Sequence, residues 1–154
     1  MTAPLRLCVR RTDRPLPTGV AVEIKLRIPS DVSVIEEAVE LLARHCFAGW
    51  DVPQRAHFRV RVALTEALAN AILYGNAEAP ASMVDVRVEC LPEALHLHVT
   101  DEGPGFDPAT VRDPVMPDDL EQPRGRGLFL IRNLMDDVRF NPPGNSICMT
   151  LRRT

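Results

Sequence analysis

Two polar residues lie four positions apart in an otherwise apolar stretch, Glu66-Ala67-Leu68-Ala69-Asn70. If this stretch is helical, the spacing places the Glu66 and Asn70 side chains on the same face. Burying a carboxylate or a carboxamide without a partner costs about 1–3 kcal/mol or more. Magnesium with water ligands would satisfy the Asn70 oxygen, and a hydroxyl or water proton would satisfy Glu66. Taken alone, the pair is more simply explained as a surface patch or a helix-to-sheet hydrogen bond.

A second polar segment, Asp101-Glu102-Gly103-Pro104-Gly105, directly follows a predicted strand. Ionised Asp101 can only accept hydrogen bonds, so it could receive the exocyclic amino group of adenine, whereas guanine would present a carbonyl there. Gly103 and Gly105 remove side chains, which allows a tight turn and a close approach to a ligand. An ordinary strand-to-loop turn favours the same residue types.

The third segment, residues 124–131 (RGRGLFLI), is a glycine-rich stretch that opens a predicted helix. Free amides and the dipole at a helix start suit a polyphosphate, and Arg124 and Arg126 add positive charge. The stretch is neither a Walker loop nor a dinucleotide fingerprint, because it lacks the G-x-x-x-x-G-K pattern and follows a loop rather than a strand. Alone, it could be an ordinary loop-to-helix junction.

The periodicity of apolar residues predicts the elements that position these segments. Strands are expected over residues 5–10, 21–28, 84–89, 95–100, 138–141 and 146–152. A helix is expected from a capping box at Ser33 to Gly49, a second from Pro53 to Tyr74, and a third from Gly127 to Met135. The proline-rich segment Arg11–Gly19 is interpreted as a linker and the acidic segment 107–124 as a mobile loop.

This order of elements predicts an α+β fold, with helices layered on one face of a mostly antiparallel sheet. The 154 residues fit one domain. We expect residues 1–20 to form an N-terminal extension and linker, and residues 21–154 to form the folded domain.

Composition excludes several other classes of protein. A net charge of −3 argues against a domain that binds nucleic acid directly. No apolar run is long enough for a transmembrane helix, and the N-terminus lacks the features of a signal peptide, so no membrane association and a cytoplasmic location are expected. The four cysteines form no C-x-x-C pair, so they are expected to be reduced rather than zinc-bound. His96 and His98 share a strand face but lack a visible third metal ligand.

Taken together, the three segments resemble the sequence boxes of the GHKL ATPase superfamily. TEALANAILYGN is similar to the N-box, DEGPGFDP to the first glycine box, and GRGLFLIRNLMDDVRF to the second. The boxes are most similar to those of small anti-sigma factor serine-protein kinases. The resemblance covers about residues 21–154, and it implies a Bergerat-type two-layer sandwich with a histidine kinase-like ATP-binding domain.

The resemblance also implies a role for each matching residue. Glu66 would be the general base, Asn70 the magnesium ligand, and Asp101 the adenine-reading carboxylate. Residues 107–124 would form a lid over the nucleotide, and Tyr74 stands where the family commonly has a histidine near the nucleotide. The nucleotide-binding set is Asn70, Tyr74, Asp101, Gly103, Gly105, Arg124, Gly125, Arg126, Gly127, Leu128 and Phe129.

The function implied by the resemblance is that of an ATP- and Mg²⁺-dependent serine-protein kinase that phosphorylates or sequesters a regulatory partner. That partner would be an anti-sigma-factor antagonist domain, a sigma factor, or both, and two copies of the chain could pair as a homodimer. The alternative is a nucleotide-gated protein-binding module with little or no catalysis. A third reading is an α+β domain without a nucleotide site.

Overall fold

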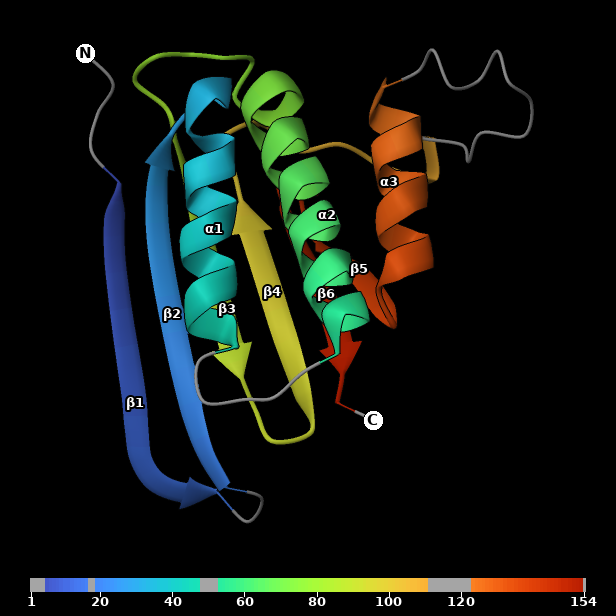
Figure 1. Cartoon of the computed structure of the whole chain (residues 1–154). Coiled ribbons are helices and arrows are strands. Elements are labelled where there is room, and N and C mark those ends of the chain that lie inside the picture. The colour runs from blue at the N-terminus through green and yellow to red at the C-terminus, as the bar shows by residue number, and fades with distance from the viewer. Residues whose placement is uncertain (1–4, 17–18, 48–52, 111–122, 154) are drawn as a thin grey trace.

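Alternating apolar residues build one six-stranded sheet, and helices cover one of its faces (Figure 1). The computed structural model describes residues 5–16, 19–47, 53–110 and 123–153. The strands are β1 (Arg6–Leu16), β2 (Gly19–Pro29), β3 (Met83–Cys90), β4 (Ala94–Thr100), β5 (Asp137–Asn141) and β6 (Ser146–Arg152). The α-helices are α1 (Ile35–Cys46), α2 (Gln54–Asn70) and α3 (Pro123–Leu134). Short helical turns are η1 (Val32–Val34), η2 (Ala71–Gly75) and η3 (Pro108–Thr110).

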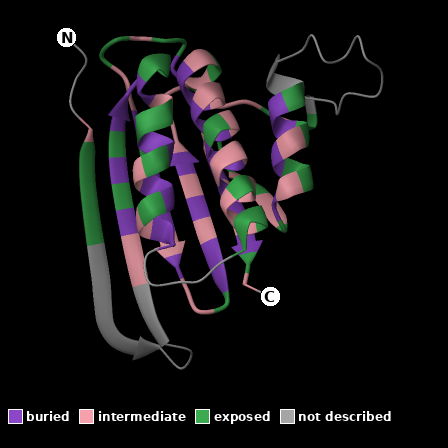
Figure 2. Cartoon of the chain, viewed as in Figure 1, coloured by how far each residue is buried: buried purple, intermediate pink, exposed green. Residues whose placement is uncertain are grey.

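The sheet has the strand order β1-β2-β3-β4-β6-β5, and the neighbouring strands pair antiparallel. Its register aligns one row of apolar side chains across the strands. Ile24 pairs with Val88, Val88 with Leu97, and Leu97 with Met149. All four are fully buried and belong to one hydrophobic core together with side chains of α1 and α2. Figure 2 shows buried positions alternating with less buried ones along the strands beneath the helices. The predicted α+β class and antiparallel sheet are confirmed.

The helices pack their apolar stripes onto that face. The buried stripe of α1 consists of Ala38, Val39, Leu42, Ala43 and Cys46, and that of α2 of Val60, Ala63, Leu64, Ala67 and Leu68. Burying one leucine completely contributes about 1.5–3 kcal/mol, so these stripes hold the helix layer on the sheet. Among the described residues, no helix combines the length and apolar character that crossing a membrane requires.

The N-terminal segment differs from its prediction. Strand β1 continues to Leu16 and pairs with β2, so the interpretation of Arg11–Gly19 as a linker is wrong over residues 11–16. The register of β1 shifts between Thr12 and Leu16. Because β1 is an edge strand, a proline, which lacks a backbone amide donor, can be accommodated in it without breaking a hydrogen bond between two strands. The division of the chain at residue 20 remains a prediction.

The start of α1 also differs. The residue that caps this region is Asp31, whose carboxylate accepts a hydrogen bond of 2.9 Å from the Ser33 amide at the start of η1. Helix α1 begins only at Ile35, and its N-cap residue Val34 makes no side-chain cap. The capping box predicted at Ser33 is therefore wrong, since a neighbouring aspartate competes for the same role. The predicted end at Gly49 lies outside the described residues.

The helical run predicted from Pro53 to Tyr74 ends at Gly75, close to its prediction, but its last turn is π-helical, and the start of the third helix differs from its prediction. Helix α2 ends at Asn70 and continues as the π-helical turn η2, closed by a 2.8 Å bond from the Asn76 amide to the Ala71 carbonyl. Helix α3 begins at Pro123 rather than Gly127. The glycine-rich stretch therefore lies within the first turns of α3 and not in a preceding loop. Most of the predicted mobile loop, residues 111–122, lies outside the described residues.

Candidate functional site

The C-terminal half of α2 carries Glu66 and Asn70 on the side that faces α3. A Cβ atom placed on Gly127 would lie 2.9 Å from Glu66 Oε2 and 3.3 Å from Asn70 Nδ2. Because Gly127 lacks a Cβ, the α3 backbone approaches these two side chains closely, and a larger residue would make the end of the Glu66 side chain shift. Among the described residues, neither the Glu66 nor the Asn70 side chain has a hydrogen-bond or ion-pair partner. Both polar groups thus remain available to a ligand.

Asp101 follows the last residue of β4 and is held firmly by its neighbours. Its backbone amide donates to the Asn145 carbonyl at 2.9 Å, and its carbonyl accepts from Asn145 Nδ2 at 3.0 Å. The Gly103 amide donates to Asp101 Oδ1 at 2.7 Å. A Cβ on Gly75 would overlap the Asp101 carboxylate, so the carboxylate packs directly on the backbone of η2. The orientation of this acceptor is therefore fixed.

One cavity joins the predicted residues from distant parts of the chain. Asn70 of α2, Asp101 after β4 and Leu128 of α3 all contribute to its wall. The full lining is Ala67, Asn70, Ala71, Val99, Asp101, Phe106, Leu128, Phe140, Gly144, Asn145, Ser146 and Ile147. Its volume is about 30 Å³, which is enough for water but not for a purine.

The glycine segments fit closely around this cavity. Gly105 has φ +82° and lies against the Pro143 backbone, while Gly144 has φ +101° and lies against Phe106. Residues that carry a side chain rarely adopt backbone conformations with such positive φ angles. The two positions let the turn after Asp101 and the turn between β5 and β6 cross in contact. A Cβ on Gly103 would overlap the Gly75 carbonyl, so this glycine is required for close packing.

Helix α3 starts at the same end of the molecule as the C-terminal end of β4 (Figure 1). Gly127 and Leu128 are buried, whereas Arg126 and Phe129 are exposed. Arg124 and Gly125 belong to α3, and the Arg124 side chain lies outside the described part. Free amides at this helix start would be available to an anion.

Tyr74 is part of η2 and is 39% exposed. It does not line the cavity, so its predicted contact with a nucleotide remains a prediction. The two histidines on β4 face the uncovered side of the sheet. His96 Nδ1 lies 2.9 Å from Thr150 Oγ1, and His98 Nε2 lies 3.0 Å from Glu89 Oε1. Within the described ranges, no group of three or more acidic, cysteine or histidine side chains is arranged to hold a metal ion.

The sequence reasoning missed several residues of the site. The cavity wall also uses Asn145 and Ser146, because the register pairs Thr100 with Ser146. Asn76 is a further residue beside the site: its side chain is buried, and its Oδ1 accepts from the amide of Glu102, the residue after Asp101. An Asn-Ser pair before a strand is a weak local signal. These roles become visible only once the strands are paired.

Comparison with known proteins agrees with this geometry. The family model for the histidine kinase-like ATPase domain matches residues 28–151. The chain is 28% identical over 138 residues to the serine-protein kinase RsbW of Staphylococcus aureus, an alignment covering 82% of this chain and 84% of the relative. RsbW of the strains RF122 / ET3-1 and MRSA252 matches with the same identity and coverage. These matches and the sheet with its helix layer confirm the resemblance drawn from the three boxes, and the chain belongs to the histidine kinase-like ATPase domain family.

Proposed function

We propose that this chain binds ATP with Mg²⁺ in the cavity between α2, α3 and the end of β4, and transfers the γ-phosphoryl group to a serine of a regulatory protein. The observation that carries this proposal is the convergence of Asn70 and Asp101 on one cavity, with Glu66 close to Asn70 beside Gly127. The similarity to serine-protein kinases supports the same reaction.

Asn70 fits a magnesium ligand. Its amide oxygen is of the type that magnesium binds, it belongs to the cavity wall, and among the described residues its side chain has no other partner. Bound magnesium would offset charge on the phosphate oxygens during transfer. The protein would contribute the position of Asn70 on a helix packed against the sheet, which is more rigid than a loop.

Glu66 would act as the base. Its carboxylate lies beside the α3 backbone at Gly127, close to Asn70 but outside the cavity lining. It would accept the proton of the attacking serine hydroxyl while the serine oxygen bonds to the γ-phosphorus and ADP leaves. Positioning such a base contributes typically about 10²–10⁴-fold to the rate.

Asp101 would recognise the adenine. Its carboxylate is oriented by Gly103 and packs on Gly75, so it can accept a hydrogen bond from the exocyclic amino group without reorganising. A purine needs more space than about 30 Å³, so a bound nucleotide would extend beyond this cavity or displace its walls. Residues 107–124 would act as the lid that closes over the bound nucleotide.

The partner would be a cytoplasmic regulatory protein, namely an anti-sigma-factor antagonist domain with an acceptor serine, a sigma factor, or both. The relatives, which are named serine-protein kinases, support an acceptor serine, and the resemblance of the three boxes to anti-sigma factor kinases implies the sigma-factor partners. The state of the lid would couple nucleotide to partner binding.

The test combines calorimetry with Mg-ADP and a phosphoserine assay with Mg-ATP and a candidate antagonist domain. Glu66→Gln keeps the side-chain shape and should lower transfer by about 100-fold or more, with Mg-ADP affinity within about threefold of wild type. Asp101→Asn should weaken Mg-ADP binding by about 10–100-fold. The matched control is Thr65→Ala, because Thr65 is next to Glu66, exposed, and bonded to the Arg61 carbonyl at 2.7 Å.

The outcomes separate the alternatives. Full transfer activity in Glu66→Gln would exclude Glu66 as the base. Nucleotide-dependent binding of the partner without phosphoserine would favour a nucleotide-gated binding module. No binding of Mg-ADP by the wild-type chain would leave an α+β domain without a nucleotide site.

A further inference from the structure

We propose that Asn76 is a positioning residue for adenine recognition, because it holds the backbone that follows Asp101. This inference rests on the proposed function, in which Asp101 reads the base. Asn76 does not line the cavity, so it would act through the Asp101 turn and not by touching a nucleotide.

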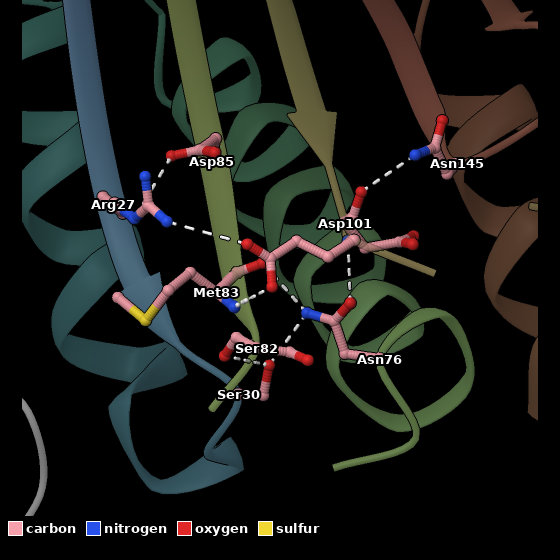
Figure 3. A network of polar contacts seen from close by, with 9 residues as sticks. Arg27, Ser30, Asn76, Ser82, Met83, Asp85, Asp101 and Asn145 are labelled. Carbon is pink, nitrogen blue, oxygen red and sulfur yellow. Dashed lines mark hydrogen bonds and ion pairs between the residues drawn. The ribbon is translucent and has the colours of Figure 1, made fainter. Parts of the chain in front are cut away.

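The Asn76 side chain is buried and its hydrogen-bonding capacity is largely used. It is 6% exposed. Its Oδ1 accepts from the Glu102 amide at 2.8 Å. Its Nδ2 donates to Ser30 Oγ at 2.8 Å and to the Met83 carbonyl at 3.0 Å. Figure 3 shows the Asn76 amide at the centre of this network. A buried amide with three such bonds has one defined orientation.

These bonds join segments that are far apart in the sequence. Asn76 follows η2, Ser30 follows β2, Met83 begins β3, and Glu102 follows Asp101. The Ser30 hydroxyl also donates to the Ser82 carbonyl at 2.8 Å, which extends the network along the chain before β3. The Asn76 side chain therefore connects the end of the π-helical turn with residues at or just beyond the ends of β2, β3 and β4.

Glu102 is held at its side chain as well as at its backbone. Its Oε2 accepts from the Met83 amide at 3.0 Å, and its Oε1 lies 3.6 Å from Arg27 Nη2. Arg27 also lies 4.0 Å from Asp85 (Figure 3). The ion pairs are about half exposed and contribute little to stability. The bond from the Glu102 amide to Asn76 is the part-buried one that fixes the main chain.

The turn at Asp101 is thus held from both sides. Asn145 bonds to the Asp101 backbone on one side, and Asn76 bonds to the Glu102 amide on the other. The Asp101 carboxylate packs on Gly75, the residue directly before Asn76. Loss of the Asn76 side chain would release the turn on one side and allow the carboxylate to change its direction. Contacts to the phosphates come from α2 and α3 in the proposed site, so they would be spared.

The experiment compares Mg-ADP with Mg-IDP, because inosine carries a carbonyl where adenine carries the amino group that Asp101 would read. Wild type should prefer ADP by about 10–100-fold. Asn76→Ala should lower ADP affinity by about 5–10-fold with little change for IDP, which shrinks the preference. Ser30→Ala is the matched control, since it removes a partner of Asn76 Nδ2 but leaves the bond to Glu102. It should lower thermal stability and keep the preference.

Asn76→Asp separates positioning from stability a second time. It retains an oxygen acceptor for the Glu102 amide and loses the Nδ2 donor. We expect it to be less stable than wild type but to keep most of the ADP preference. The proposal is overturned if folded Asn76→Ala keeps the full preference for ADP over IDP. It is also overturned if Asn76→Asp, which retains the acceptor oxygen, loses as much of that preference as Asn76→Ala does. Wild-type protein that binds neither nucleotide, or both equally, would instead contradict the proposed role of Asp101.

Discussion

The Glu66 carboxylate lies against the backbone of Gly127, so closely that a Cβ on Gly127 would be 2.9 Å from Oε2. This contact joins the candidate base on α2 to the glycine-rich start of α3. The two residues are far apart in the sequence, and the packing of α2 on α3 brings them together.

Replacing Gly127 with alanine should therefore damage the site more than the fold. Alanine favours a helix by about 1 kcal/mol over glycine, which offsets part of the strain from the close contact. We expect a thermal midpoint near that of wild type, but weaker Mg-ATP binding and slower transfer, because Glu66 and Asn70 must both move. Calorimetry and the phosphoserine assay measure these effects.

The control for that variant is Asn133→Ala, on the exposed side of α3, where Asn133 donates to the Phe129 carbonyl at 2.7 Å. It should leave nucleotide affinity unchanged. Unaltered affinity and transfer in Gly127→Ala would show that the site tolerates a side chain at this contact.

Replacing Gly75 or Gly103 with alanine should lower the free energy of unfolding of the protein by different amounts. A Cβ on Gly75 would overlap the Asp101 carboxylate, a side chain that can be displaced at the cost of its 2.7 Å bond from the Gly103 amide, whereas one on Gly103 would overlap the Gly75 carbonyl of the main chain. Gly103→Ala should therefore cost more free energy of unfolding, and Gly75→Ala should mainly weaken Mg-ADP binding. Urea unfolding and calorimetry on both variants test this order, and the reverse order would contradict it.

Asp31 should contribute stability that depends on pH. The hydrogen bond from Ser33 lowers the pKa of the Asp31 carboxyl below its ordinary value of 3.8. A lowered folded-state pKa means that the contribution is present above this ordinary value and is lost as pH falls through the folded-state pKa. Asp31→Asn keeps a capping oxygen without the charge.

Unfolding of wild type and Asp31→Asn in urea should therefore differ by an amount that shrinks between neutral pH and about pH 2. Other carboxyl groups titrate in the same range, but they are common to both proteins and cancel in the difference. A difference that stays constant with pH would rule out this linkage.

Cys148 should react slowly with thiol reagents. Burial, followed by the nearby Glu89 and Asp137 carboxylates, raises the pKa of its thiol, so less of the reactive thiolate is present at a given pH. Cys8 is exposed on β1 and should be modified first. Mass spectrometry of labelled peptides over a range of pH measures both rates.

Glu89→Gln removes one of the two carboxylates and should speed the labelling of Cys148 without changing that of Cys8. Equal rates at both cysteines in wild type would contradict the raised pKa. The variant also alters the 3.0 Å contact with His98, so Asp137→Asn provides an independent second variant.

Much of the secondary structure was predictable because its signal is local. The alternation in β2, with Ile24 and Leu26 buried between charged neighbours, and the apolar stripe of α1 follow from the geometry of strands and helices. The three polar segments were also recognisable by residue type and order. The resemblance of these segments to known boxes assigned Gly127 and Asn70 to one site, although no local sequence pattern predicts that the two residues lie close together.

The start of α1 and of α3 could not be predicted, because several residues nearby can serve the same local role. Asp31 and Ser33 are both good caps, and the choice between them depends on how the chain leaves β2. Pro123 suits the first turn of a helix as well as a loop.

The sequence by itself determined which chemical groups are present and the elements on which most of them lie. Tertiary structure decided which of them meet: Asn145 reaches Asp101 only because β4 pairs with β6, and Asn76 reaches Glu102 only because η2 ends beside the start of β3. These two hydrogen bonds span 26 positions (Asn76 to Glu102) and 44 positions (Asp101 to Asn145) of the sequence. They therefore depend on the register of the sheet and on the packing of the helices. The free energy that fixes this register and this packing comes from burial of the whole hydrophobic core, so it cannot be inferred from any short segment.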